Sequence, residues 1–237
     1  MKTKLLLTTL FGVAAWSLSS LAMANWNTGA CPGTGTAPCI ETEINGNTYH
    51  FNGSGGHAGV WHGRPAAEGG GDFDFSDDSV ILECPEDRRD CELSLSGEVK
   101  KCQDSSGDWR IGVRVNDADV STGDFLCAFV SVGGFPWYSK DPAIASHCPF
   151  EDACDSFIPY DSGASTYTAN FGTIDVSAAG SPLVSNGHLH SVIFTPGVGA
   201  NFNFTGPKKF FDCNDDELGC TIDGVLTIDN ATSLDIH

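Results

Sequence analysis

Residues 111–116, IGVRVN, carry an aliphatic side chain at positions 111, 113 and 115 and a small or polar residue between them. The same period of two recurs in residues 72–75, DFDF, and in residues 92–95, ELSL. Because successive side chains of a strand point to opposite faces of a sheet, this alternation is typical of strands with one buried face. The three stretches therefore predict β-strands, and they decide the fold class.

The rest of the chain extends this pattern into short strands separated by turn residues. Residues 125–132, FLCAFVSV, form a more continuous apolar run between glycines, which predicts a central strand. Further strands are expected at residues 48–52, 166–176, 188–195, 201–205 and 221–228. The 28 glycines and 11 prolines argue against long helices. We expect an all-β fold, either a disulfide-stapled β-sandwich or a β-barrel-like domain.

Three segments are expected along the chain. Residues 1–24 have the pattern of a signal peptide: two lysines, an apolar stretch and a small-residue cleavage motif, Ala-Met-Ala, so that the mature protein begins at Asn25. The alternative, a membrane anchor, is disfavoured because the apolar run is marginal in length and polar residues follow it. Residues 25–71 form a glycine-rich N-terminal region, and residues 72–237 form the β-sandwich domain. The signal peptide predicts a product exported from a bacterium.

The charge of the chain excludes one large class of partners. The sequence has 31 acidic residues against 12 lysines and arginines, and its net charge at pH 7 is −19. A field of this sign repels nucleic acid and anionic lipid, so we expect neither as a partner.

Ten cysteines in an exported chain predict five disulfides. The sequence does not determine the connectivity, but the spacings favour local loops. The favoured pairs are Cys31–Cys39, Cys84–Cys91, Cys148–Cys154, Cys213–Cys220 and, across two strands, Cys102–Cys127.

Motifs for catalysis are missing from the sequence. It contains no GxSxG nucleophile elbow and no CxxC pair. Glycoside hydrolysis by a pair of carboxylates stays an alternative, because 31 acidic residues offer many pairs whose separation the sequence does not define. We expect a protein that is not an enzyme and that needs no cofactor.

Two segments are weighed as metal sites. Residues 212–219, DCNDDELG, offer the oxygen ligands Asp212, Asn214 and Asp216 for calcium, although they do not fit the EF-hand pattern. His188 and His190 lie two residues apart and share one face of a strand, but their sequence neighbours supply no third ligand. His57 and His62 are interpreted as loop residues.

A candidate for an exposed apolar patch is the run Phe135, Pro136, Trp137 and Tyr138, four consecutive cyclic side chains that follow two glycines. The favoured interpretation is that Trp137 plugs one end of the sandwich.

The central and C-terminal segments resemble a known family. Residues 91–99, CELSLSGEV, and residues 115–137, VNDADVSTGDFLCAFVSVGGFPW, are similar to the bacterial alkane-oxidation protein activator (PraB-like) family, as are residues 219–228, GCTIDGVLTI. The features that carry the resemblance are Cys91, Gly97, Val99, Leu126, Cys127, Gly134, Pro136 and Trp137. It extends over roughly residues 72–235. It implies a small secreted β-rich protein without catalytic residues that assists growth on hydrocarbons or acts in the extracellular matrix.

Three hypotheses follow. The first is a non-enzymatic exported protein that acts at the cell surface or in the extracellular matrix on apolar substrates or hydrocarbon interfaces. The second is a subunit of a filament or biofilm matrix that assembles with copies of itself by strand addition, using the glycine-rich segment or the C-terminal residues 233–237 as the donor. The third is a calcium-dependent adhesin or carbohydrate-binding module.

Overall fold

The computed structural model describes residues 26–33, 37–52, 57–85, 87–144 and 148–237. The predicted signal peptide, residues 1–24, lies outside these described residues. Within them the chain forms seventeen β-strands and three short 3₁₀ turns, so the all-β class is confirmed. The 3₁₀ turns are η1 (Ala66–Glu68), η2 (Cys127–Phe129) and η3 (Cys154–Ser156). Nowhere in the described part of the chain is there a helix long and apolar enough to cross a membrane.

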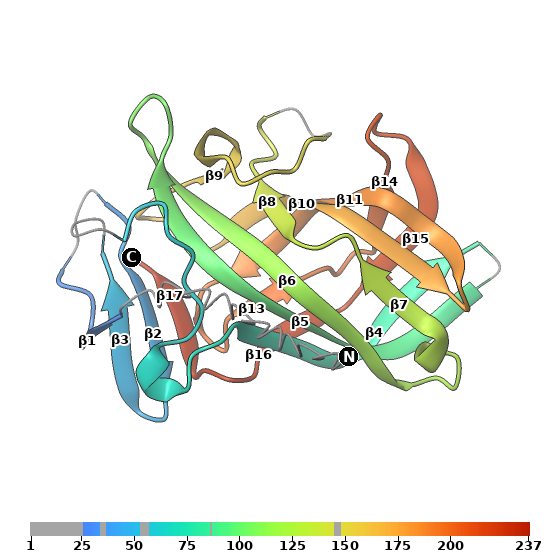
Figure 1. Cartoon of the computed structure of the whole chain (residues 1–237), viewed down its shortest axis with the longest axis horizontal. Coiled ribbons are helices and arrows are strands. Elements are labelled where there is room, and N and C mark those ends of the chain that lie inside the picture. The colour runs from blue at the N-terminus through green and yellow to red at the C-terminus, as the bar shows by residue number, and fades with distance from the viewer. Residues whose placement is uncertain (1–25, 34–36, 53–56, 86, 145–147) are drawn as a thin grey trace, which may run out of the picture.

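The smaller of two sheets has five strands and stands at one end of the larger one (Figure 1). In order of pairing its strands are β1 (Asn27–Thr28), β3 (Asn47–Phe51), β2 (Ile40–Ile44), β17 (Ser233–Ile236) and β12 (Gly197–Val198). Strand β2 buries one face of this sheet, because Ile40, Thr42 and Ile44 are buried and the residues between them are not. The strand expected at residues 48–52 is confirmed as β3.

The larger sheet contains the long strands of the molecule. Its members are β4 (Phe73–Cys84), β5 (Asp87–Gln103), β6 (Trp109–Gly123), β7 (Val130–Gly133), β8 (Trp137–Lys140), β9 (Ile158–Pro159), β10 (Tyr167–Ala178), β11 (Ser181–Thr195), β13 (Asn201–Asn203), β14 (Lys208–Phe211), β15 (Glu217–Asp223) and β16 (Val225–Ile228). The predicted strands over residues 73–75, 92–95 and 111–116 are confirmed as parts of β4, β5 and β6. The prediction over residues 221–228 covers two strands, β15 and β16.

The pairing of the larger sheet closes on itself. Antiparallel ladders run β4–β5–β6–β8–β10–β11–β13–β16 and then return to β4. A second series of antiparallel pairings also connects β11 to β4, through β14 and β15. Strand β7 pairs with β10 beyond the end of β8. The result is a barrel-like sheet whose long strands are hydrogen-bonded on both sides.

The interior of this barrel-like sheet holds most of the hydrophobic core. Four phenylalanines pack together in it: the ring centroid of Phe202 lies 4.8 Å from that of Phe75, 5.0 Å from that of Phe194 and 5.9 Å from that of Phe171. These rings come from four different strands. Aromatic packing of this kind therefore ties opposite walls of the sheet together.

The small sheet joins the two ends of the described chain. Strands β2 and β3 belong to the glycine-rich region, whereas β17 is C-terminal and pairs with β2 on one side and with β12 on the other. The expected boundary between the glycine-rich region and the β-sandwich domain, after residue 71, therefore separates strands that pair within this one sheet. The C-terminal segment that was expected as a free donor strand is already paired on both sides within its own chain.

The disulfides differ from the predicted pairs in four of five cases. Only Cys31–Cys39 is confirmed, and no described cysteine is free. The other four bonds are Cys84–Cys220, Cys91–Cys127, Cys102–Cys154 and Cys148–Cys213. The physical reason is strand register: β4 pairs with β15 so that Glu83 lies opposite Thr221, which places Cys84 beside Cys220 although they are 136 residues apart. Five disulfides are typical of an oxidising, extracellular-type environment.

The strand predicted over residues 125–132 is wrong for residues 125–129. Only Val130–Gly133 is a strand, β7, and it is preceded by the turn η2. The apolar residues before it lie at the surface. A continuous apolar run does not reveal whether it is buried, and here the run divides between a short strand and an exposed turn.

Candidate functional site

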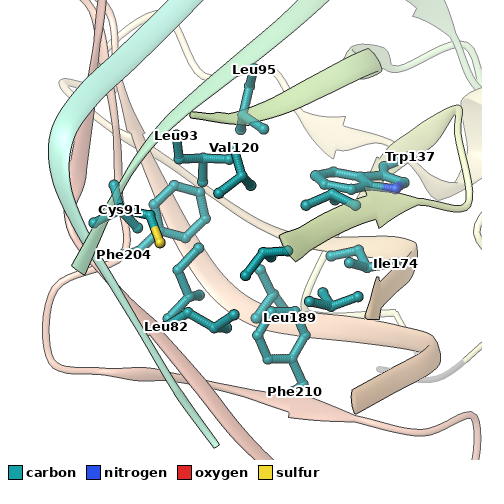
Figure 2. Close-up of a pocket in the computed structure, with 15 residues that line it drawn as sticks. Leu82, Cys91, Leu93, Leu95, Val120, Trp137, Ile174, Leu189, Phe204 and Phe210 are labelled. Carbon is teal, nitrogen blue, oxygen red and sulfur yellow. The ribbon is translucent and has the colours of Figure 1, made fainter. Parts of the chain in front are cut away.

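An apolar cavity lies inside the barrel-like sheet and is lined by residues other than the four phenylalanines described above. Its volume is about 60 Å³, and only apolar side chains of the described residues line it. Figure 2 shows labelled side chains from surrounding strands converging on it, among them Leu82, Leu93, Trp137, Leu189 and Phe210.

The alternation of the strands explains which side chains line the cavity. Leu93 and Leu95 of β5 and Val80 of β4 point inward, and β10 contributes Ile174 and Val176. Phe204, Phe210 and Trp137 add aromatic rings to this mainly aliphatic lining, and together these side chains leave opposite walls incompletely in contact. The indole of Trp137 satisfies its one polar atom, because Nε1 donates a hydrogen bond to the carbonyl oxygen of Gly133 at 2.9 Å.

The chemistry of the cavity restricts what it can hold. The described residues around it present no charge and no hydrogen-bonding side chain to an occupant, and apolar cavities of this kind stay dry and take apolar guests. Drug-sized ligands need pockets of roughly 300 Å³ or more. The cavity is therefore suited to a small apolar group, such as the end of an alkyl chain.

An exposed apolar turn, residues 125–129, borders the cavity. Phe125 is 84% exposed, Leu126 46% and Phe129 49%, and the two phenylalanine rings meet edge to face at 6.0 Å. The disulfide Cys91–Cys127 anchors this turn to β5, and Cys91 also lines the cavity. Val130, which follows Phe129 directly, is a second lining residue. The exposed turn and the cavity therefore share one end of the barrel-like sheet.

Hydrogen bonds hold the backbone of the exposed turn at both ends. Asp90 and Asp124 are joined by two hydrogen bonds, from Asp124 N–H to the Asp90 carbonyl oxygen at 2.9 Å and from Asp90 N–H to Asp124 Oδ2 at 3.1 Å. At its other end the carbonyl oxygen of Phe129 accepts a 2.8 Å bond from Ala179 N–H. The apolar side chains are thus presented on a fixed frame with carboxylates at its border.

The predicted apolar patch at residues 135–138 is wrong. Trp137 is only 6% exposed, and Phe135 is partly buried and stacks on its indole at a centroid distance of 4.7 Å. The favoured interpretation, in which Trp137 plugs one end of the sandwich, agrees with the burial of its indole. The sequence reasoning missed Phe125, Leu126 and Phe129 because it placed them in a buried strand; the Gly123-Asp124 turn just before them was the available signal.

The predicted calcium ligands share one tight turn between β14 and β15. Asp212 Oδ1 accepts hydrogen bonds from the backbone N–H groups of Asn214 at 2.8 Å and Asp216 at 3.0 Å, and these bonds lower the pKa of Asp212. The Asn214 amide also donates to Asp212 Oδ2 at 3.3 Å. This carboxylate therefore organises its own turn, and calcium binding by Asp212, Asn214 and Asp216 stays a prediction.

The same turn brings a third group to the histidine pair. Asp215 Oδ1 lies 3.1 Å from His188 Nε2 and 3.5 Å from His190 Nε2, and the two Nε2 atoms are 2.8 Å apart. Burial lowers the pKa of both histidines below the ordinary value, against the opposing effect of Asp215. The sequence offered no signal for Asp215, which is 25 residues beyond His190.

A second group of potential ligands, Cys31, Glu41 and His237, also lies close together. The sulfur of Cys31 is bonded to Cys39, and the backbone N–H of Cys31 donates to Glu41 Oε2 at 2.6 Å. A disulfide sulfur is not a thiolate, so this group lacks its best ligand.

His62 was interpreted from the sequence as a loop residue, but its side chain belongs to the buried interior. It is completely buried, stacks on Phe51 at a centroid distance of 3.7 Å, and contacts His57 through Nε2 and Nδ1 at 3.2 Å. Lys101 lies buried beside the same phenylalanine and donates to the carbonyl oxygens of Pro38 and Phe51, and burial lowers its pKa to about 7. These residues hold the glycine-rich region against β5.

A scan against models of protein families, a search of curated proteins and a search of solved structures each found no match to this chain. The resemblance to alkane-oxidation protein activators therefore stays a prediction.

Proposed function

We propose that this chain is an exported, non-enzymatic protein that binds neutral apolar surfaces, such as hydrocarbon droplets, through the exposed turn of residues 125–129. The observation that carries the proposal is the position of this turn beside a wholly apolar cavity. The turn supplies the contact with the surface, and the cavity accepts the end of an alkyl chain.

Export is supported by the five disulfides, which are typical of an oxidising compartment, together with the predicted signal peptide. The proposed surface also agrees with what the resemblance to alkane-oxidation protein activators implies.

The charge of the chain favours a neutral surface over an anionic one. Asp90 and Asp124 border the exposed turn, and the net charge is −19. An anionic lipid surface is repelled by this field, whereas a hydrocarbon phase carries no charge to be repelled. The occupant that fits both the apolar turn and the acidic surroundings is therefore a neutral hydrocarbon.

The expected strength is modest. Burying a fully exposed phenylalanine or leucine gains about 1.5–3 kcal/mol, so the partly exposed side chains of the turn together gain about 3–5 kcal/mol. The Cys91–Cys127 bond limits the conformational entropy that adsorption removes, since the turn is already fixed. We therefore expect reversible adsorption.

The test is adsorption to hexadecane droplets by the disulfide-intact protein and by the double variant Phe125→Ser/Phe129→Ser. Because Phe125 lies largely in solvent and about half of Phe129 does, the variant should stay folded with at most a small drop in melting temperature and adsorb at least about tenfold more weakly. The matched control is Val198→Ser, which removes a residue that is 85% exposed on β12, in the other sheet. The control should adsorb like the wild type. Equal adsorption by the double variant and the wild type would contradict the proposal.

A second measurement in the same experiment tests the cavity. A brominated alkane quenches the fluorescence of a tryptophan that it touches, and Trp137 lines the cavity. We expect quenching that disappears in Trp137→Phe, with the other tryptophans as internal reference. Quenching unchanged by this substitution would contradict entry of the chain into the cavity.

A further inference from the structure

A separate site lies on the outer face of the barrel-like sheet, on the opposite side of β11 from the apolar cavity. Leu189 points inward and lines the cavity, so the side chains on either side of it, His188 and His190, project outward. This alternation brings two imidazoles to one face. It separates them from the cavity by the thickness of the sheet.

A β-bulge at residues 190–191 of β11 includes the second histidine of the pair. In the ladder between β10 and β11, Ala169 faces Val192 but Phe171 faces Leu189, so β11 has one residue more than β10 at this point. Ser191 adopts a positive φ of 53°, and its N–H donates to Asn170 Oδ1 at 2.9 Å. Bulges of this kind re-aim side chains and are frequent next to functional sites.

Asp215 is delivered to the pair by the turn between β14 and β15. The residue has a positive φ of 65°, and the Asp212 carboxylate holds the turn through the hydrogen bonds described above. Cys213 in this turn is bonded to Cys148. The segment that follows Cys148 also packs on the pair, because the ring of Phe150 lies 5.3 Å from that of His188.

The three ligand atoms have the spacing that a metal ion requires. They are separated by 2.8, 3.1 and 3.5 Å. Nitrogen and oxygen ligands about 2.0–2.2 Å from a zinc ion lie about 2.8–3.1 Å apart at 90° and about 3.3–3.6 Å apart at the tetrahedral angle. A single ion is therefore within bonding distance of all three atoms without a change of strand positions.

The surroundings are apolar on one side and open on the other. Phe211 stacks on His190 at a centroid distance of 4.2 Å, and His188 is completely buried. His190 and Asp215 are partly exposed, which leaves solvent access for a fourth ligand such as water. Near the site, Asp212 adds negative charge, and Lys140, whose pKa burial lowers, is within electrostatic reach of Asp215.

From this geometry we propose that His188 Nε2, His190 Nε2 and Asp215 Oδ1 bind a divalent transition-metal ion, and that zinc is the ion to test first. Two imidazoles and one carboxylate suit zinc and its neighbours, whereas calcium and magnesium prefer oxygen ligands alone. This site shares the turn of residues 212–216 with the predicted calcium ligands but uses the one aspartate of that turn that the prediction left out.

The experiment uses the disulfide-intact protein after treatment with a chelator and its removal. Titration calorimetry with zinc chloride should give one ion per chain and a higher melting temperature in the presence of the ion. The variants His190→Ala and Asp215→Asn remove partly exposed ligands, and each should weaken zinc binding about 100-fold or more while circular dichroism shows an unchanged fold. Cobalt, added in place of zinc, should give visible absorption bands that are lost in His190→Ala.

Two controls separate this site from other histidines and from general acidity. His57→Ala removes an imidazole beside His62, outside the proposed site, and should bind zinc like the wild type. Calcium should give no binding that depends on His190. Absence of stoichiometric zinc binding, or binding that His190→Ala and Asp215→Asn leave unchanged, would overturn the proposal.

Discussion

At the scale of single residues, His62 shows how burial decides the state of a titratable group. Its Nδ1 contacts the carbonyl oxygen of Val60 at 2.9 Å, and its Nε2 contacts Nδ1 of His57 at 3.2 Å. Both contacts are satisfied by a neutral ring that carries its proton on Nδ1. Removal from water lowers the pKa of His62 to about 4.

This shift predicts a loss of stability in mild acid. In the unfolded chain a histidine has a pKa near 6.5, so between about pH 6.5 and pH 4 the unfolded state binds a proton that the folded state does not. The contribution of His62 is therefore fully present above pH 6.5 and falls by about 3 kcal/mol as the pH drops to 4. Denaturant unfolding of the wild type and of His62→Gln, at several pH values, measures the difference.

The variant should lose less stability than the wild type over this interval. The control is His237→Gln, since that ring lies at the surface of the C-terminal end and its removal should leave the pH dependence of the wild type. Parallel pH profiles for the wild type and His62→Gln would contradict the assignment.

At the scale of elements, Gly97 explains how β5 and β6 stay paired through an irregularity. The ladder shifts here, because Ser96 faces Asp117 but Gly97 faces Val115. A Cβ atom on Gly97 would lie 2.2 Å from the carbonyl oxygen of Arg114, which belongs to the backbone of the neighbouring strand. Glycine is therefore required by the close approach of the two strands.

Gly97→Ala should reduce the free energy of unfolding by about 1–3 kcal/mol, because the two backbones must move apart. Gly133→Ala in β7 is the matched control, since its added Cβ would meet nothing closer than Asp175 Cβ at 3.9 Å and its φ is not positive. The control should be neutral or gain up to about 1 kcal/mol. Guanidinium unfolding compares the two, and equal losses would refute the role of close approach.

The elements also show what the sequence could and could not predict. Alternation is a local property, so the buried faces at Phe73, Leu95 and Ile111 followed from it directly. The run at residues 125–132 contains no alternation, and apolar character alone did not distinguish a central strand from a surface turn.

The sites depend on contacts between distant segments, which local patterns do not encode. The shared face of His188 and His190 was predictable from their spacing along one strand. Their approach to Asp215 requires the pairing of β11 with β14 and the turn that follows β14. The same reason explains the disulfides, because the register between strands decides which cysteines meet.

At the scale of the whole molecule, the barrel-like sheet closes by pairing its first strand in the sequence with its last two. Strand β4 opens the larger sheet in sequence, and it is completed by β16 and β15, about 150 residues later in the chain. The disulfide Cys84–Cys220 lies at this seam and spans 136 residues, whereas Cys31–Cys39 spans eight. The seam is therefore where the unfolded chain has the most entropy to lose.

This difference predicts unequal contributions of two disulfides to stability. In the chain-entropy treatment, a loop of 136 residues corresponds to about 5 kcal/mol and a loop of eight to about 2–3 kcal/mol. Replacing Cys84 and Cys220 by alanine should therefore lower the free energy of unfolding by more than replacing Cys31 and Cys39, and the burial of Cys84 and Cys220 adds to the loss in the same direction. Guanidinium unfolding of the two double variants measures the comparison, with the other four disulfides of each verified by mass. A loss at the Cys31–Cys39 loop that equals or exceeds the loss at the seam would show that closure of the sheet is maintained by strand pairing and packing without help from the covalent bond.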